Sequence, residues 1–274
     1  MKTGFCDRVM LDGVEMNAAE ARISPLGDGF MFGHGIFETI KVLRGQPVFF
    51  AEHAARLERS ARELELKVAD GLGERVRALI AANGLEEGAL KIVIFLGESS
   101  GGELLTLRPF FYPAASYEAG FRLKTFPDAR PIGQTAALKS LSYLKNRRAR
   151  AGARALGFDD ALFVGPEGNV LESSTANLFV VKAGEVFTPP IESGVLPGIA
   201  RAIVLALKPG KKVRETPVTE AMWHEADEVF VTNALLGVMP VARIDERAYE
   251  MKPDGWTRKI QTDFRAAQQR SIGK

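Results

Sequence analysis

The sequence predicts an α+β protein built from two domains. Stretches with the two-residue period of strands are interspersed with stretches that have the helical period, without regular strand–helix–strand winding. The length of 274 residues exceeds the usual size of one domain, and 46% of the residues are hydrophobic. Proline and small residues at 112–116 interrupt the periodic segments. We therefore expect an N-terminal domain over 1–115, a linker over 116–124 and a C-terminal domain over 125–274.

The N-terminal part predicts a short sheet with two helices. Turns are expected at Asp12-Gly13 and at Arg44-Gly45, on either side of a strand over 36–42. A helix is predicted over 52–67, where apolar residues recur at spacings of four, three and four. A second helix over 72–82 and a buried strand over 91–96 follow.

The C-terminal part mixes short strands with three helices. Alternating or β-branched runs predict strands over 121–126, 161–164, 178–181, 185–188 and 228–231. Helices are predicted over 144–156, over 198–207 and from Trp256 onward. Gly157 is suited to ending the first of these helices, and Ala183-Gly184 to joining two strands.

Composition favours a soluble cytoplasmic enzyme over several other classes of protein. The 36 basic and 34 acidic residues give a net charge of +2, too balanced for a nucleic-acid binder. No apolar run approaches the roughly 20 residues that span a bilayer, so no membrane partner is expected. Cys6 has no second cysteine to pair with, which is typical of a reducing compartment. Three histidines without clustered spacing predict no metal site.

Common enzyme signatures are interrupted in this chain. The GHGIFE run at 33–38 ends in glutamate where a dinucleotide-binding motif has glycine. The glycine-rich run at 97–102 lacks the lysine of a phosphate-binding loop. Neither motif therefore predicts a nucleotide site.

A set of separated sequence blocks points to one cofactor. These blocks are GHGIFET at 33–39 with HAARL at 53–57, LKSLSYL at 138–144, GNVLESSTANLF at 168–179, and LPGIAR at 196–201 with TNA at 232–234. In this order and spacing they resemble the fold-type IV, or class IV, pyridoxal-phosphate enzymes. That family contains branched-chain aminotransferases, D-amino acid aminotransferases and aminodeoxychorismate lyases.

The resemblance implies an architecture and a set of partners. The fold would be that of the D-amino acid aminotransferases, with pyridoxal 5'-phosphate in the cleft between the two domains. The substrate would be a small amine or amino acid. The protein would be a homodimer in which side chains of the partner subunit complete each site.

The resemblance assigns the catalytic lysine to Lys139, which would form the Schiff base with the cofactor aldehyde. Such a lysine must be neutral part of the time, and burial favours the neutral amine. The alternative is an ordinary surface lysine. Lys145 lies nearby within basic surroundings, and we assign it to a solvated helix face.

Two further charged residues match cofactor contacts of the family. Glu172 matches the acid that keeps the pyridine nitrogen protonated, so that the ring can accept electrons. The alternative for Glu172 is a solvent-facing cap after a strand. Arg56 matches the arginine that binds the phosphate, for which a planar guanidinium is well suited. The alternative for Arg56 is an ion pair along its own helix.

The remaining matched residues surround the ring and the phosphate. Backbone amides at the start of a helix at Gly198, Ile199 and Ala200 would bind the phosphate, with Asn233 and Ala234 beside it. Leu196 would pack on one face of the ring. Tyr143 matches a tyrosine that hydrogen-bonds the ring oxygen, and ordinary core packing is its alternative.

Among the reactions of this family, the sequence slightly favours 4-amino-4-deoxychorismate lyase, which forms 4-aminobenzoate and pyruvate. Many aminotransferases have threonine where Ala200 and Ala234 stand, and residues 233–241 resemble the lyases. The alternative is an aminotransferase acting on branched-chain or other amino acids with 2-oxoglutarate. A more remote alternative is a non-catalytic protein that binds pyridoxal phosphate, which the intact Lys139, Glu172 and Arg56 disfavour.

Overall fold

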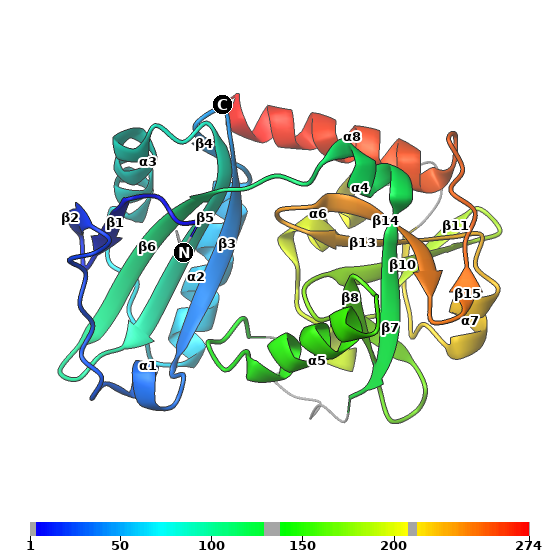
Figure 1. Ribbon diagram of the computed structural model, residues 1–274, viewed down its shortest axis with the longest axis horizontal. Coiled ribbons are helices and arrows are strands. Elements are labelled where there is room, and N and C mark those ends of the chain that lie inside the picture. The colour runs from blue at the N-terminus through cyan, green and yellow to red at the C-terminus, as the bar shows by residue number, and fades with distance from the viewer. Residues whose placement is uncertain (1–3, 129–137, 208–212, 274) are drawn as a thin grey trace. The chain divides into compact units, whose positions relative to one another are not determined.

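The fold is seen in a computed structural model, in which residues 4–128, 138–207 and 213–273 are described. Contacts divide the chain into two compact units. Unit 1 comprises Met1–Phe111, Leu138–Ser142 and Gln268–Lys274, and unit 2 comprises Tyr112–Ala137 and Tyr143–Ala267. The predicted mixture of strands and helices is confirmed (Figure 1).

These units differ in detail from the predicted division of the chain. Residues 116–124, predicted as a linker, lie in helix α4 (Ala114–Ala119) and strand β7 (Phe121–Pro127). Residues 138–142, predicted within the C-terminal domain, group with unit 1 because their backbone hydrogen-bonds to a strand there. The division into domains 1–115 and 125–274 remains a proposal.

Unit 1 contains an antiparallel six-stranded sheet in the order β2-β1-β6-β5-β3-β4. Its strands are β1 (Arg8–Leu11), β2 (Val14–Asn17), β3 (Gly35–Leu43), β4 (Gln46–Pro47), β5 (Glu87–Leu96) and β6 (Gly101–Pro109). Its helices are α1 (Asp28–Met31), α2 (Phe50–Glu63) and α3 (Leu72–Asn83). Ile40 of β3, Leu57 of α2 and Leu79 of α3 share one core, so α2 and α3 pack on the same face of the sheet.

Helix α2 ends earlier than the predicted residue 67. Glu65 adopts a left-handed φ of 55°, which is incompatible with continuing the helix. The N–H of Leu66 then donates to the carbonyl of Ala61, so the chain turns back and Leu66 is buried. Apolar periodicity alone therefore overestimates the length of the helix.

Strand β6 was not predicted, because its first residues read as a glycine-rich loop. Gly102 lies opposite Phe95 in the register of β5 and β6. A Cβ on Gly102 would lie 2.3 Å from the Phe95 ring, so the glycine makes room for that ring. The same strand alternates buried Glu103, Leu105 and Leu107 with less buried neighbours, as expected for a period of two.

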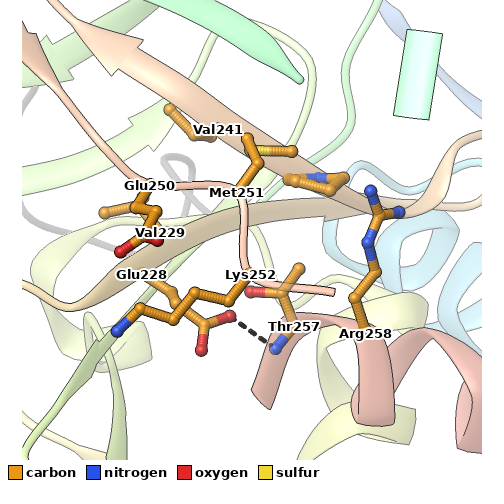
Figure 2. Close-up of a pocket in the computed structure, with 9 residues that line it drawn as sticks. Glu228, Val229, Val241, Glu250, Met251, Lys252, Thr257 and Arg258 are labelled. Carbon is orange, nitrogen blue, oxygen red and sulfur yellow. Dashed lines mark hydrogen bonds between the residues drawn. The ribbon is translucent and has the colours of Figure 1, made fainter. Parts of the chain in front are cut away.

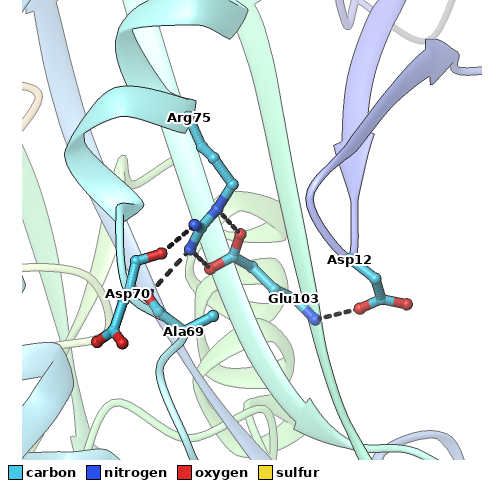
Figure 3. A network of polar contacts seen from close by, with 5 residues as sticks. All are labelled: Asp12, Ala69, Asp70, Arg75 and Glu103. Carbon is cyan, nitrogen blue, oxygen red and sulfur yellow. Dashed lines mark hydrogen bonds and ion pairs between the residues drawn. The ribbon is translucent and has the colours of Figure 1, made fainter.

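A charged cluster ties β6 to α3 and to the loop before it (Figure 3). Arg75 donates to both carboxylate oxygens of Glu103, at 2.7 and 2.8 Å. It also donates to the carbonyls of Ala69 and Asp70. The N–H of Glu103 donates to Asp12 at 2.8 Å, which adds the first hairpin to the cluster. Because Glu103 is buried, this bidentate pairing compensates its charge.

Unit 2 contains a nine-stranded sheet whose main path runs β12-β11-β10-β13-β14-β7-β8-β9, with β15 beside β14. Besides β7, its strands are β8 (Asp160–Val164), β9 (Val170–Ser173), β10 (Asn177–Lys182), β11 (Glu185–Thr188), β12 (Val213–Glu215), β13 (Glu228–Asn233), β14 (Gly237–Ile244) and β15 (Arg247–Ala248). Strands β9 and β10 also pair with each other, at Glu172 and Asn177. This pairing connects the two ends of the run β10-β13-β14-β7-β8-β9.

Helices accompany this sheet. Besides α4, they are α5 (Leu144–Ala155), the 3₁₀ turn η2 (Ile191–Ser193), α6 (Ile199–Leu207), α7 (Glu220–His224) and α8 (Trp256–Ile272). Glu228 accepts the backbone N–H groups of Trp256 and Thr257, both at 2.8 Å, and thereby caps α8. No helix within the described ranges is long and apolar enough to cross a membrane.

The predicted turn pairs are confirmed. Both residues have positive φ in Asp12-Gly13, Arg44-Gly45 and Ala183-Gly184. Each pair connects two antiparallel strands, as that backbone conformation favours.

Candidate active site

Lys139 is held against strand β3 in unit 1. Its carbonyl accepts the N–H of Phe37 at 2.9 Å, and the N–H of Leu141 donates to Gly35 at 2.8 Å. This edge of β3 is open to them because β4 pairs only with Val42 and Leu43. The Lys139 ammonium lies 4.6 Å from the centre of the Phe37 ring, and the residue is half-buried. A rigid backbone and partial removal from water suit a reactive amine.

Arg56 lies on the opposite face of the same sheet, in a buried charged cluster. Its Nε and Nη2 donate to the two oxygens of Glu38, each at 2.7 Å. Nδ1 of His53 lies 2.7 Å from the same carboxylate. Helical spacing places His53 and Arg56 on the buried side of α2, facing the strand that carries Glu38. The ion pair seen for Arg56 is thus with strand β3, whereas the alternative considered from the sequence was an ion pair along its own helix.

The Glu38 carboxylate remains ionised despite its burial. Burial alone would raise its pKa, but the hydrogen bonds from His53 and Arg56, together with their charges, lower the pKa to about 2. Sequence reasoning missed Glu38 and His53. The available signal was a glutamate at an inward position of a strand, between Ile36 and Ile40.

Glu172 lies in unit 2 at the pairing of β9 with β10. Its Oε2 accepts the N–H of Leu196 at 3.0 Å and Nδ2 of Asn177 at 3.1 Å. Asn177 also donates to the carbonyl of Leu196 at 2.9 Å. Only 8% of Glu172 is exposed, so the alternative of a solvent-facing cap is wrong. Two fixed donors hold the Glu172 carboxylate in one orientation.

Tyr143 also lies within unit 2, just before α5. Its hydroxyl donates to the carbonyl of Ser174 at 2.6 Å, and Asn146 donates to the same oxygen at 2.9 Å. Burial raises the pKa of Tyr143, and the negative charges of Glu172 and Asp160 raise it further. The phenol therefore stays protonated at ordinary pH.

The start of α6 lies beside the Glu172 cluster. A Cβ on Gly198 would lie 2.0 Å from Oδ1 of Asn177, so this position needs glycine. Ile199 and Ala200 are buried in the first turn, where backbone N–H groups lack helical partners. Leu196 is half-buried and joined to Glu172 through its N–H.

The TNA block is adjacent to this cluster through strand pairing. Asn233 donates to the carbonyl of Thr175 at 3.0 Å, and its Oδ1 accepts the N–H groups of Leu235 and Leu236 at 2.9 Å. Ala234 contributes no polar side-chain atom. Thr232, paired with Asn177 in the sheet, has a buried hydroxyl without a hydrogen-bond partner in the described part of the chain.

The groups within each unit are of the kinds that pyridoxal phosphate needs. Unit 1 supplies a primary amine and a buried guanidinium, and unit 2 supplies a buried carboxylate with fixed donors and a glycine-started helix. The unsatisfied Thr232 hydroxyl is a further donor in unit 2. Lys145 is exposed on helix α5, as the assignment to a solvated helix face predicts, and its ammonium pairs with the buried Asp128.

Other polar sites do not coincide with the predicted residues. A pocket at the start of α8 is lined by Glu228, Glu250, Lys252, Thr257 and Arg258, among others (Figure 2). Here Glu228 already caps the helix. Among the described residues, no three His, Cys, Asp or Glu side chains form a group that could hold a metal ion.

Comparisons with known proteins identify the family. Residues 35–244 match the family model for amino-transferase class IV. The branched-chain-amino-acid aminotransferase of Escherichia coli is 28% identical over 277 residues, covering 89% of this chain and 87% of its own. The aminodeoxychorismate lyase of Bacillus subtilis is 25% identical over 269 residues, covering 88% of both chains.

A solved structure of the Escherichia coli branched-chain aminotransferase superposes with a TM-score of 0.89 at 26% identity. The match covers 96% of this chain and 95% of the other. The predicted fold class and family resemblance are thereby confirmed.

Proposed function

The chain belongs to the amino-transferase class IV family, and we propose that it transfers the amino group of a branched-chain or similar amino acid to 2-oxoglutarate. The protein is an enzyme, and class IV aminotransferases use pyridoxal phosphate. The non-catalytic alternative is therefore set aside. The slight preference for the lyase is not confirmed, because branched-chain aminotransferases recur among the relatives.

The observation that supports a pyridoxal-phosphate reaction is the anchored carboxylate of Glu172, and the preference for an aminotransferase rests on the relatives. When bound, pyridoxal phosphate supplies an electrophilic carbon and an electron-withdrawing ring. Glu172, held by Leu196 and Asn177, would keep a proton on the ring nitrogen. Lys139 would move a proton at the substrate Cα.

We assign phosphate binding to Arg56 and to the first amides of α6 at Gly198, Ile199 and Ala200. Asn233 and Ala234 would lie beside it. Leu196 would pack on the ring, and Tyr143 would contact the ring oxygen.

A second candidate function is aminodeoxychorismate lyase. Alanine at 200 and 234 favours it, and a lyase of Bacillus subtilis matches most of the chain. Lys139 would then take a proton from C4 of the substrate ring rather than from an amino acid Cα. Both reactions begin with one deprotonation, so they share the same cofactor contacts.

One experiment separates the two reactions. Purified enzyme with pyridoxal phosphate is given 2-oxoglutarate and a panel of L- and D-amino acids, and separately aminodeoxychorismate. We expect glutamate to form with branched-chain L-amino acids. Formation of 4-aminobenzoate and pyruvate instead would assign the lyase, and inactivity in both assays would contradict both proposals.

We also propose that the enzyme is a cytoplasmic homodimer with partner side chains completing each site. Exposed apolar side chains in unit 1, at Ile23, Leu26, Phe30, Met31 and Phe32, support a surface that a second copy covers. Light scattering after size-exclusion chromatography should give twice the mass of 29.8 kDa. A monomeric mass in the active preparation would contradict this proposal.

A further inference from the structure

We propose that Asp160 is a positioning residue for the 173–176 turn, the connection between β9 and β10 in unit 2. This inference rests on the proposed function, because the residues that the turn holds include predicted cofactor contacts. Asp160 itself belongs to no sequence block that indicated the cofactor. It begins β8 and is 1% exposed.

The Asp160 carboxylate receives four hydrogen-bond donors. Its Oδ1 accepts the N–H of Ala161 at 2.8 Å and the hydroxyl of Ser174. Its Oδ2 accepts the hydroxyls of Ser173 at 2.9 Å and Thr175 at 2.7 Å. Because an ionised carboxylate only accepts, all three hydroxyls are fixed as donors to it. The three consecutive hydroxyl residues of the 168–179 sequence block, Ser173 to Thr175, therefore all donate to Asp160.

These hydroxyls determine the shape of the turn. While Ser173 donates to Asp160, its oxygen accepts the N–H of Ala176 at 2.9 Å and that of Thr175 at 3.3 Å. Two backbone amides of the turn are thus connected to the carboxylate through one hydroxyl. The loss of the charge would free the Ser173 hydroxyl to rotate, and the amides would lose a fixed acceptor.

Backbone carbonyls of the 173–176 turn accept hydrogen bonds from three side chains and so position them. The Ser174 carbonyl accepts Tyr143 at 2.6 Å and Asn146 at 2.9 Å. The Thr175 carbonyl accepts Asn233 at 3.0 Å. Tyr143 and Asn233 are both assigned to the cofactor, so Asp160 would act on cofactor binding through the turn.

The test replaces Asp160 by asparagine, which has the same shape without the charge. Asp245→Asn is the matched control: Asp245 also accepts a hydroxyl and an N–H, both from Thr125, but it does not contact the 173–176 turn. In apoprotein, amide hydrogen exchange at Thr175 and Ala176 should accelerate about tenfold in Asp160→Asn only. The dissociation constant for pyridoxal phosphate should rise by about tenfold as well.

A double-mutant cycle separates positioning from general destabilisation. Tyr143→Phe should raise the dissociation constant less in the Asp160→Asn background than in wild type, because both changes disrupt one path. The inference would be overturned if the effects of the two substitutions on the dissociation constant were additive. It would also be overturned if Asp160→Asn had the amide exchange rates and the cofactor affinity of wild type. If Asp160→Asn does not fold, Ser174→Ala should give a smaller rise of about threefold, and an unchanged constant there would also overturn it.

The proposed function fails by a different result. A wild-type protein that folds but binds no pyridoxal phosphate would refute the function and the cofactor role of Asp160 together. The exchange measurement on apoprotein would still decide whether Asp160 holds the turn.

Discussion

Replacing Glu172 by glutamine tests whether the cofactor ring acts as a full electron sink. In the structure, Oε2 of Glu172 is held by Leu196 and Asn177, and the residue is 8% exposed. Glutamine retains the size and an oxygen that can accept from Leu196. Glu172→Gln should therefore fold, with a stability loss of about 1 kcal/mol. Its main effect should be the loss of charge beside the ring nitrogen.

The expected kinetic effect follows from the cost of removing one preorganised electrostatic contact. Such a loss raises a barrier by about 3–4 kcal/mol in a buried site. The deprotonation step should then slow by about two to three decades. Cofactor affinity should change little, because the phosphate contacts lie elsewhere.

The assay is single-turnover absorbance of the bound cofactor after mixing with an accepted amine. Glu228→Gln is the matched control, since Glu228 is another buried carboxylate of unit 2 that accepts two backbone N–H groups. That control should lose stability at the start of α8 but keep the wild-type rate. A wild-type deprotonation rate in Glu172→Gln, with cofactor fully bound, would remove Glu172 from the mechanism.

Three further predictions address unit 1 and the start of α6. Lys139→Ala should abolish turnover and the visible absorbance of bound cofactor while the fold persists. If Lys139→Ala kept this absorbance and Lys145→Ala lost it, Lys145 would be the lysine that binds the cofactor. The pKa of Glu38 is lowered from an ordinary 4.5 to about 2, so its contribution to stability is present above pH 4.5 and is lost as the pH falls toward 2. Urea unfolding at pH 6 and pH 3 should show that Glu38→Gln removes part of the wild-type acid sensitivity, about 2 kcal/mol over this interval. Parallel pH dependences would contradict this. Gly198→Ala should lower the free energy of unfolding by about 1–3 kcal/mol and weaken cofactor binding, because the new Cβ would clash with Asn177. A Tm and a cofactor affinity equal to those of wild type would refute the close approach.

Much of the local structure could be predicted from the sequence. Apolar periodicity located α2, a helix stop signal located the end of α3, and β-branched runs located β5 and β10. The turn at Asp12-Gly13 followed from the backbone preferences of its own two residues. These features depend on interactions within a few residues, so a single sequence contains the necessary information. The block order also identified the family, and with it Lys139 and Glu172 as candidates.

The tertiary structure decided which distant residues meet. Arg56 pairs with Glu38, and Asp160 collects the hydroxyls of Ser173 and Thr175, through contacts that depend on sheet register and helix packing. The sequence also suggested that Lys139 belongs with the C-terminal domain, whereas its backbone pairs with β3. That pairing exists because β4 is too short to cover the whole edge of β3, a consequence of tertiary assembly. Local preference cannot specify such partners, because the free energy of a buried hydrogen bond is available only after the chain has brought both groups together.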